Sequence, residues 1–496
     1  MANIMPLQIC EHELTKLTDF QKEIHTLDLN RSKDEDGIND PFNSSFTKIL
    51  CYSMSKIKMT SVDQGSYKSF SLDCTLHLLA DSYLIMRTPT IEVKPECQDF
   101  VRIAFCHNLM HNIIEEARFE EDGLVFNNFD NYWYDIHLQF LKNYQGDIHS
   151  KRIKYSKCIG NIPLLENFST KLVSVELACP QPFFYSNDTG CSYPIYKKGS
   201  LSRARHTFKF NLDVSKLLRI QCRKRKPDSN SYTEWVDFSV NTVDLKSIIT
   251  VKGEIAQPEL YGCYVNYAQN AYSFYANDGC DNSKDQINEL YITDMITFDS
   301  SKSYSYGETA EPTTLKNINP CLALFWMAEN LDAKKYNNHS NYTTNTFSIE
   351  KGHDPISKHS LSLNSQAKFN NYSSIHFNSI DPMRHFPTVP FENGYFGSSF
   401  CWFIPREGID YGVTFKDDRL LCYLEDTDPN IDDHKLSIDQ LINAENYSSE
   451  KERDRPKFRL ICRGLILRKI SYEKDNSGQI KISIDKVIKH KSKDDN

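Results

Sequence analysis

The sequence predicts an all-β protein in which two β-rich blocks of about 200 residues each follow one another. Three observations predict this fold class. Strand-like segments with a period of two recur along the chain, and the segments between them are rich in Asn, Ser, Asp, Gly and Pro. No repeat with a fixed period of roughly 20 to 50 residues is present, which disfavours a propeller or a solenoid. Sandwiches or jelly rolls fit this pattern.

Four segments show the two-residue alternation most clearly: Val101–Phe105, Ala204–Leu212, Leu460–Ile470 and Ile480–Ile484. Each alternates apolar with mostly polar side chains, as expected for half-buried strands. Asn108–Glu116 and Asp285–Met295 have helical apolar spacing instead, and we expect two short helices within loops there.

An arm and a tail flank the two blocks. In the arm, Leu14, Leu17, Phe20 and Ile24 have helical spacing, and the charged linker Arg31–Asp40 follows them. The predicted boundaries are 1–40 for the arm, 41–255 for the first block, 256–490 for the second block and 491–496 for the tail, with Ala256–Gly262 as the joint between blocks.

The composition excludes several classes of protein. Hydrophobic residues make up 40% of the 496 residues and aromatic residues 12%, too many for a disordered or fibrous chain. The formal net charge of −8 disfavours a protein that coats nucleic acid over its whole surface. We therefore expect a globular protein without a specific nucleic-acid partner.

The cysteines predict reduced thiols. There are 15 of them, an odd number, and no two lie in a Cys-x-x-Cys pair, which disfavours a disulfide scaffold and a zinc ribbon. Met1–Cys10 has no basic region before its short apolar run, and no stretch approaches about 18 uncharged apolar residues. We expect neither a secretory signal nor a membrane span.

Two groups of histidines suggest metal sites, but neither has a suitable spacing. Cys97, Cys106, His107 and His111 form the densest Cys/His cluster, yet their spacing matches no common zinc pattern, and two core thiols with two polar loop histidines explain them as well. The second block contains four histidines beside two aspartates: His353, His359, His376 and His385 with Asp354 and Asp381. A cupin-like site needs a His-x-His pair, which is missing.

Motifs for enzymatic chemistry are also missing. The chain has no Gly-x-Ser-x-Gly, Walker A, Gly-x-Gly-x-x-Gly or His-Glu-x-x-His sequence. We expect no catalytic, cofactor-binding or metal-binding residue, no cofactor and no enzyme activity.

Two surface signals have ordinary explanations. The basic run Arg223–Lys226, which ends at Pro227, suits a nuclear signal or a phosphate-binding patch, but such a run is more often a solvated loop between strands. Eight Asn-x-Ser/Thr sequons occur, at Asn30, Asn43, Asn167, Asn187, Asn338, Asn341, Asn371 and Asn446. In an Asn-rich chain without a secretory signal, we interpret most of them as chance matches.

Three ordered stretches carry a family resemblance. The first, Val101–Leu141, contains Asn108-Leu109, Ile113–Phe119, Gly123 and Asp130-x-x-Trp133-x-Asp135-Ile136. The second is Pro182-Phe183-Phe184-Tyr185-Ser186-Asn187-Asp188-Thr189-Gly190, followed by Pro194 and Ala204–Leu212. The third contains Asn319-Pro320, Leu324-Phe325-Trp326, Gly352-His353-Asp354, His385, Pro390, Gly394-Tyr395, Ser399-Phe400 and Pro405. Together, over about residues 80–415, they resemble the major capsid proteins of the nucleocytoplasmic large DNA viruses, of the iridovirus, phycodnavirus and asfarvirus type.

The resemblance implies a fold and also has limits. It implies a double jelly roll, two tandem rolls of about eight strands each with short helices in loops. Independently of the resemblance, we interpret the large aromatic residues Trp133, Phe183, Phe184, Trp326 and Trp402 as core anchors. The chain departs from the family where Cys191-Ser192-Tyr193 precedes Pro194, in place of Ala-Leu-Pro, and where Ile409-Asp410-Tyr411-Gly412 replaces Pro-Ser-Gly.

The function that the resemblance implies is structural. It is a major capsid protein that forms homotrimeric, pseudo-hexagonal capsomers of an icosahedral shell, located in the virion and assembled in a virus factory of the host cytoplasm. The implied partners are two further copies, neighbouring capsomers, minor capsid and penton proteins, and an inner viral membrane that the arm contacts. The alternatives are a minor capsid paralogue, a poxvirus-type scaffold protein, and a carbohydrate-binding jelly-roll module.

Overall fold

The computed structural model describes most of the chain between residues 52 and 485. The described residues are 52–142, 148–186, 192–195, 202–226, 232–239, 245–253, 255–267, 289–299, 302–305, 308, 310–316, 319–363, 366–401, 416–424, 457–474 and 480–485. The predicted arm (1–40), the predicted tail (491–496) and Trp402 lie outside the described residues.

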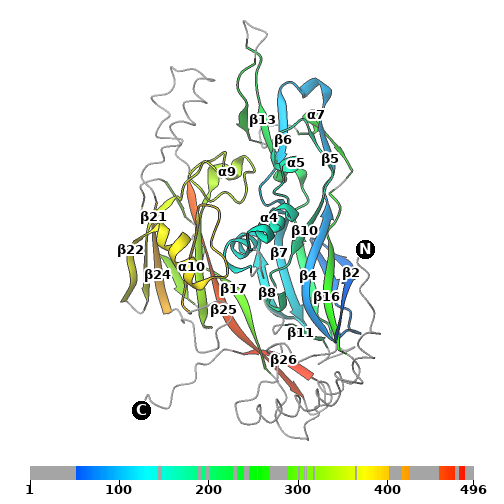
Figure 1. Ribbon diagram of the computed structural model, residues 1–496, viewed down its shortest axis with the longest axis vertical. Coiled ribbons are helices and arrows are strands. Elements are labelled where there is room, and N and C mark those ends of the chain that lie inside the picture. Colours follow the sequence, from blue (N-terminus) through cyan, green and yellow to red (C-terminus); the bar gives the residue numbers. More distant parts are fainter. Residues whose placement is uncertain are drawn as a thin grey trace.

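Two five-stranded antiparallel sheets form the body of the first unit (Figure 1). One sheet contains β1 (Tyr52–Lys58), β16 (Glu259–Tyr267), β4 (Leu78–Arg87) and β10 (Glu176–Pro180) in that order, with β11 (Tyr193–Pro194) beside β4. The other contains β2 (Thr60–Gln64), β3 (Tyr67–Ser71), β12 (Arg205–Phe210), β7 (Ile114–Glu121) and β8 (Leu124–Asp130).

The alternation of β7 shows why these residues form a half-buried strand. Ala117 and Phe119 are fully buried, whereas the alternate residues Arg118 and Glu120 keep part of their surface in solvent. Glu120 accepts from the Arg205 side chain of the neighbouring strand β12 at 2.7 Å, across the outer face of the sheet. The period of two therefore places an apolar row inside and a charged row outside.

Two smaller sheets extend the first unit at its upper end in Figure 1. One contains β14 (Val236–Phe238), β13 (Leu218–Cys222) and β6 (Val101–Phe105), and the other contains β15 (Ile249–Lys252), β5 (Thr90–Val93) and β9 (Lys171–Leu172).

The second unit also consists of two sheets. The larger one contains β17 (Glu289–Thr297), β25 (Phe458–Lys474), β20 (Cys321–Asn330) and β23 (Tyr395–Ser399) in that order, with β18 (Ser303–Tyr304) and β26 (Ile480–Asp485) paired to β25. The smaller one contains β19 (Thr313–Lys316), β24 (Lys416–Leu424), β21 (Ile356–Leu363) and β22 (Gln366–Ser373). All ten residues of β20 are buried, as expected of a central strand that is covered on both faces.

Short helices decorate the sheets. They are η1 (Pro95–Cys97), α2 (Leu109–Ile113), α3 (Asn131–Ile136), η2 (His137–Leu141), α4 (Ile148–Cys158), α5 (Pro163–Glu166), η3 (Phe184–Ser186), α6 (Val214–Leu217), α7 (Leu245–Ile248), α9 (Leu331–Lys335), η8 (His376–Ile380) and α10 (Asp381–His385). Asp130 starts α3, because its carboxylate accepts the backbone N–H of Trp133 at 2.9 Å.

The mostly β architecture is confirmed, and a strand is present in each of the four segments. Val101–Phe105 is β6, and β12 lies within Ala204–Leu212. The late segments fall within β25 and β26. The half-buried alternation expected of Leu460–Ile470 is wrong, because residues 460–467 are all buried.

The two helix predictions need correction. The helix predicted over Asn108–Glu116 ends at Ile113, because Ile114 already enters β7. The helix predicted over Asp285–Met295 is wrong, since Glu289–Thr297 forms β17 and pairs residue by residue with β25. A short apolar run does not separate helix from strand, and here the pairing partner decides.

Part of the predicted joint is a strand of the first unit. Strand β16 begins at Glu259, inside the expected joint Ala256–Gly262, and pairs with β1 and β4 of the first unit. The first unit therefore includes residues up to Tyr267, and the next described strand, β17, belongs to the second unit.

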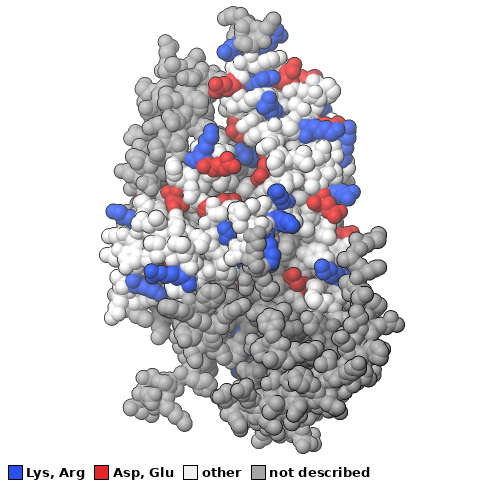
Figure 2. Space-filling view, viewed as in Figure 1, with Lys and Arg blue, Asp and Glu red and all other residues white. Residues whose placement is uncertain are grey.

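Aromatic side chains form much of the core. Trp133, Phe183, Phe184 and Trp326 are each at most 2% exposed, which confirms four of the five expected anchors. One cluster of buried side chains runs from the first unit into the second, and another lies within the second unit. On the face shown in Figure 2, acidic and basic side chains are intermixed.

A buried histidine connects the two sheets of each unit. In the first unit, Nε2 of His206 lies 2.5 Å from the hydroxyl of Tyr185, which lies 2.7 Å from the hydroxyl of Ser82 on β4. In the second unit, Trp326 on β20 donates from Nε1 to Nδ1 of His359 on β21. Both histidines are fully buried.

Candidate functional site: the buried polar network between the two units

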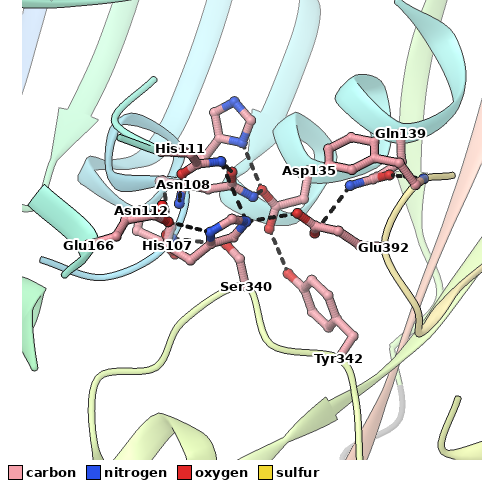
Figure 3. Close-up of polar contacts among 12 residues, drawn as sticks. His107, Asn108, His111, Asn112, Asp135, Gln139, Glu166, Ser340, Tyr342 and Glu392 are labelled. Atoms are coloured by element: carbon pink, nitrogen blue, oxygen red, sulfur yellow. Dashed lines mark hydrogen bonds and ion pairs between the residues drawn. The ribbon is translucent and has the colours of Figure 1, made fainter. Parts of the chain in front are cut away.

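The two units meet at a set of buried polar contacts, which we call the inter-unit network. Residues of the first unit between His107 and Gln139 supply one side of it. The other side comes from β17, β20 and β25 of the second unit and from its loops around Tyr342 and Glu392 (Figure 3). These first-unit residues fall within the first of the three stretches that carry the family resemblance.

His107 joins two carboxylates from the two units. Its Nδ1 lies 2.6 Å from Glu166 on α5, and its Nε2 lies 2.9 Å from Glu392 of the second unit (Figure 3). Burial disfavours the charged ring, but the charges and hydrogen bonds of Glu392 and Glu166 outweigh burial and raise the pKa of His107 to about 10. At neutral pH the ring is therefore a cation, and it lies between the side chains of Glu166 and Glu392.

Gln139 holds the same second-unit loop in place. Its Nε2 donates to Glu392 at 3.2 Å, and its Oε1 accepts the backbone N–H of Phe391 at 3.0 Å. Thr388 donates its hydroxyl to the Gln139 carbonyl at 2.9 Å. Gln139 thus binds both side chains and backbone of the second unit.

Asp135 is the centre of a second group of contacts. Its Oδ1 accepts from Nδ1 of His111 at 2.7 Å and from Nδ2 of Asn108 at 2.9 Å, while its Oδ2 accepts the hydroxyl of Tyr342 at 2.9 Å (Figure 3). Asp135 is 1% exposed. Three hydrogen bonds satisfy this buried side chain, as a buried polar group requires, and one of them comes from the other unit.

Gly394 allows the loop that contains Tyr342 to pack directly against the backbone at position 394. The φ of Gly394 is +90°, and a Cβ at this position would overlap the carbonyl oxygen of Tyr342. Asp354 fixes the same turn, because its Oδ1 accepts the N–H of Gly394 at 2.6 Å and its Oδ2 accepts from Asn378 at 2.6 Å. The Gly352-His353-Asp354 and Gly394-Tyr395 motifs therefore form one loop assembly.

A buried arginine of the second unit forms an ion pair with the first unit. Arg463 on β25 is 1% exposed and donates from Nη2 to Asp130 at 2.6 Å, and its Nη1 donates to Asp299. Burial opposes the charge, but Asp130 and Asp299 outweigh burial and raise the pKa of the guanidinium. Asp130 thus caps α3 with one oxygen and binds the second unit with the other.

The carboxylate of Glu329 on β20 accepts hydrogen bonds from three side chains. Tyr132 of the first unit donates its hydroxyl at 2.6 Å, Lys334 donates at 2.9 Å, and Arg459 donates to the other oxygen at 2.6 Å. Burial opposes ionisation of Glu329, but the two cations and the Tyr132 hydroxyl outweigh it and lower its pKa.

Asn127 connects the second stretch to β17. Its Oδ1 accepts the backbone N–H of Phe184 at 3.0 Å, and its Nδ2 donates to the Thr293 carbonyl at 2.8 Å and to Asp294 at 3.2 Å. Arg468 donates to the other oxygen of Asp294 at 2.5 Å. The Pro182–Ser186 segment is therefore tied to the first sheet pair and to the second unit at one point.

Four of the six histidines that suggested metal sites have side-chain partners within the fold. His107 and His111 bind carboxylates, and Cys106 is a buried thiol whose pKa is raised by burial. His359 binds Trp326, whereas His385 faces Asp381 at 3.6 Å. Within the described residues, no three Cys, His, Asp or Glu side chains are placed so that they hold a metal ion.

The described thiols and sequons can also be placed. Cysteines whose side chains the structure describes are free thiols, as predicted. Asn338 and Asn341 are each 2% exposed and donate to the carbonyls of Thr346 and Asn345, so folding removes both sequons from a glycosylating enzyme. Asn167 and Asn371 are exposed, and the other four sequons lie outside the described residues.

Sequence reasoning missed most of the network. Asp130, Asp135 and Trp133 stood out only as members of a motif, and Glu166, Glu329, Glu392 and Arg463 carried no local signal. His107 and Glu392 are 285 residues apart in sequence. The available signal was the polar character of Asp130 and Asp135 beside the apolar residues Trp133 and Ile136, which predicts a buried polar group.

The network fixes the orientation of one unit relative to the other. Directional hydrogen bonds between buried charges tolerate little displacement, because a displaced partner leaves an uncompensated charge in a medium of low polarity. No helix among the residues described is long and apolar enough to cross a membrane.

Comparison with known proteins identifies similar chains. Residues 42–223 match the family model described as the major capsid protein N-terminus, and residues 284–409 match that of the large eukaryotic DNA virus major capsid protein. The major capsid protein of Costelytra zealandica iridescent virus is 26% identical over 348 residues, covering 67% of this chain and 70% of that protein.

Two solved structures show the same fold. A PBCV-1 virus capsid model matches with a TM-score of 0.58 at 12% identity, covering 89% of this chain and 99% of that one. The Faustovirus major capsid protein matches with a TM-score of 0.59 at 8% identity, covering 92% and 98%. The predicted double jelly roll is confirmed.

Proposed function

We infer that this chain, which belongs to the major capsid protein family of the large eukaryotic DNA viruses, builds the viral shell as a homotrimeric, pseudo-hexagonal capsomer. It is a structural protein of the virion capsid and not an enzyme. The association of three copies in one block is our proposal.

The observation that supports the proposal is the inter-unit network. A block with hexagonal outline requires six similar elements at fixed angles, and three copies of a chain with two rolls supply them. The angle between the two rolls of one chain must then be constant. Buried pairs such as Arg463–Asp130 and His107–Glu392 supply that constancy within each copy.

A ring of three copies also needs two different contact surfaces on each copy. For one of them we assign the outer edge of the second unit, where β22 lies farthest from the first unit in Figure 1. Tyr372 on β22 exposes 44% of its surface and Ile375, just after this strand, exposes 59%, while Met383 on the following helix α10 exposes 66%. The occupant that we propose is the first unit of a neighbouring copy, which would remove these apolar side chains from water.

The oligomeric state tests the proposal. Light scattering on the purified chain should give three times its mass of 57.5 kDa, and negative-stain images should show pseudo-hexagonal particles. A stable monomer at micromolar concentration would contradict the trimer.

A pair of variants tests the contact surface. Ile375→Asp together with Met383→Asp should yield folded monomers, whereas Leu164→Asp, at an equally exposed apolar position on α5, should leave the trimer intact. If the double variant remains trimeric, the outer edge of the second unit is not the contact.

The proposal extends to the assembled virion. We propose that neighbouring capsomers, minor capsid and penton proteins bind the trimer, that the arm 1–40 contacts these proteins or an inner membrane, and that assembly takes place in the host cytoplasm. Deleting residues 2–38 should leave trimers intact but prevent closed shells when the protein is expressed with its partners. Loss of soluble trimer would show that the arm belongs to the fold.

A further inference from the structure

The basic run Arg223–Lys226 directly follows β13, the central strand of the sheet β14–β13–β6, and a structural role in the shell does not explain it. Strand β13 ends at Cys222, and Arg223 continues the chain with Lys224, Arg225 and Lys226, of which the last three are exposed. Figure 2 shows Lys and Arg side chains, with Asp and Glu side chains among them, at the upper end of the molecule, where Figure 1 places β13.

Aromatic rings hold two arginines of this region in place. The guanidinium of Arg223 lies 4.2 Å from the ring centre of Tyr232 and 4.4 Å from that of Trp235. The guanidinium of Arg102, from β6, lies 4.0 Å from the same Trp235 ring. The register agrees, since Arg102 is opposite Gln221 and Val236 is opposite Cys222, which places Trp235 beside Arg223.

The backbone adds further order to this region. Arg223 donates its Nε–H to the Asp99 carbonyl at 2.7 Å, and its own N–H bonds to the Phe100 carbonyl at 3.0 Å. Lys224 and Thr233 exchange hydrogen bonds at 2.8 Å. A stacked guanidinium that is fixed at Nε has lost much of its rotamer freedom, so its Nη groups can bind an oxyanion at low entropic cost.

We propose that this surface, formed by Arg102, Arg223, Lys224, Arg225 and Lys226, binds a sulfated polysaccharide. The nearest acidic residues are Asp99, Asp228 and Glu234 in sequence, together with Asp237, which lies opposite Gln221 and pairs with Arg219, so the five cations still exceed them in number. The planar guanidinium fork matches a sulfate group in two-point contact, and the exposed lysines add charge without a geometric demand.

The chemistry of the surface favours a polysaccharide over a nucleic acid. Single-stranded nucleic acids bind by stacking bases on aromatic faces, but the rings of Tyr232 and Trp235 already carry guanidinium groups. A duplex needs a long track of phosphate contacts, which a chain with a net charge of −8 does not offer. A flexible polymer with separate sulfates needs only this short surface.

Binding of heparin oligosaccharide to the purified full-length protein tests the proposal, with calorimetry over a range of salt concentrations. The triple variant Lys224→Gln, Arg225→Gln, Lys226→Gln should bind at least about tenfold more weakly, and its log K against log salt slope should fall by roughly two to three. Arg223→Lys keeps the charge but loses the fork, and we expect a severalfold loss from it.

The matched control removes the same charge elsewhere. Lys151→Gln, Lys154→Gln, Lys157→Gln takes three exposed cations from α4 and should leave the affinity within about twofold. An equal loss in both triple variants would overturn the assignment of this surface. Desulfated heparin should not bind, and equal or tighter binding of single-stranded or duplex DNA through the same residues would overturn the choice of polysaccharide. Melting temperatures show that each variant is folded.

Discussion

Trp326 donates a hydrogen bond from its indole Nε1 to Nδ1 of His359 at 3.0 Å, and this contact joins the two sheets of the second unit. An acceptor Nδ1 carries no proton, so Nε2 holds the ring proton and faces the Ser374 hydroxyl at 3.1 Å. Protonating the ring would break the contact with Trp326. His206 in the first unit is buried in the same way, between Tyr185 and the ring of Phe119 at 4.7 Å.

We predict that acid weakens both units. Burial lowers the pKa of His206 and of His359 to about 3, against an ordinary value of 6.5. Below about pH 6.5 these histidines therefore bind protons in the unfolded chain but not in the folded chain. The free energy of unfolding decreases as the pH falls toward 3. Each histidine contributes a loss of about 2 kcal/mol between pH 6.5 and pH 5.

Melting temperatures from pH 7.5 to pH 4.5 check this prediction. His359→Gln should melt lower than the parent at pH 7.5, because it loses packing, but its melting temperature should fall less steeply with acid. His149→Gln, at an exposed position on α4, should follow the parent. Parallel curves for the parent and His359→Gln would contradict the assignment.

Removal of the buried arginine should destabilise the chain strongly. Arg463→Met leaves Asp130 and Asp299 without their cation, and we expect a loss of about 3–5 kcal/mol in the free energy of unfolding. Adding Asp130→Asn and Asp299→Asn should recover a large part of it, because the stranded charges disappear and Asn still caps α3. Urea unfolding measures both effects.

An exposed ion pair provides the control. Arg87→Met breaks the pair with Glu176, whose side chains are 66% and 62% exposed, and should change the free energy of unfolding by less than about 1 kcal/mol. If Arg463→Met costs no more than Arg87→Met, the inter-unit network does not hold the two units together.

Alanine substitutions at two glycines with similar φ angles distinguish the cost of backbone strain from the cost of a steric clash. A Cβ on Gly253 (φ +92°) would have no heavy atom within 4 Å, whereas a Cβ on Gly394 (φ +90°) would strike the Tyr342 carbonyl. Gly253→Ala should cost about 1 kcal/mol, from the left-handed backbone alone. Gly394→Ala should cost clearly more, and equal losses in thermal unfolding would show that the loop moves aside freely.

The ion pairs of His107 with Glu166 and Glu392 should stop stabilising the fold at high pH. Because the pKa of His107 is raised to about 10, its stabilising effect is fully present below about pH 6.5 and disappears as the pH rises through 10. His107→Gln should therefore be less stable than the parent at pH 6, by about 1–3 kcal/mol, and the difference should shrink toward pH 10.5. A difference that does not depend on pH would mean that the ring is held by packing alone.

Local patterns predicted the strands because alternation needs only neighbouring residues. Val101–Phe105 and Ala204–Leu212 each show which side chains face inward, and the structure has β6 and β12 there. The family motifs predicted the double jelly roll for a similar reason, since Asp130-x-x-Trp133 encodes a helix cap followed by a core anchor within four residues. Such information is contained in short segments.

Contacts between distant segments decided the rest. They decided that Glu289–Thr297 is a strand, that Glu259–Tyr267 pairs with the first unit, and which residues meet across the inter-unit network. Glu392 and Arg463 look like ordinary surface charges in the sequence, yet Arg463 is 1% exposed. A charge becomes buried only when its counter-charge arrives from a distant segment, as Asp130 does across 333 positions. Short-range patterns were therefore enough to predict which segments become strands and which family they resemble, whereas long-range electrostatic pairing fixes the two rolls to each other.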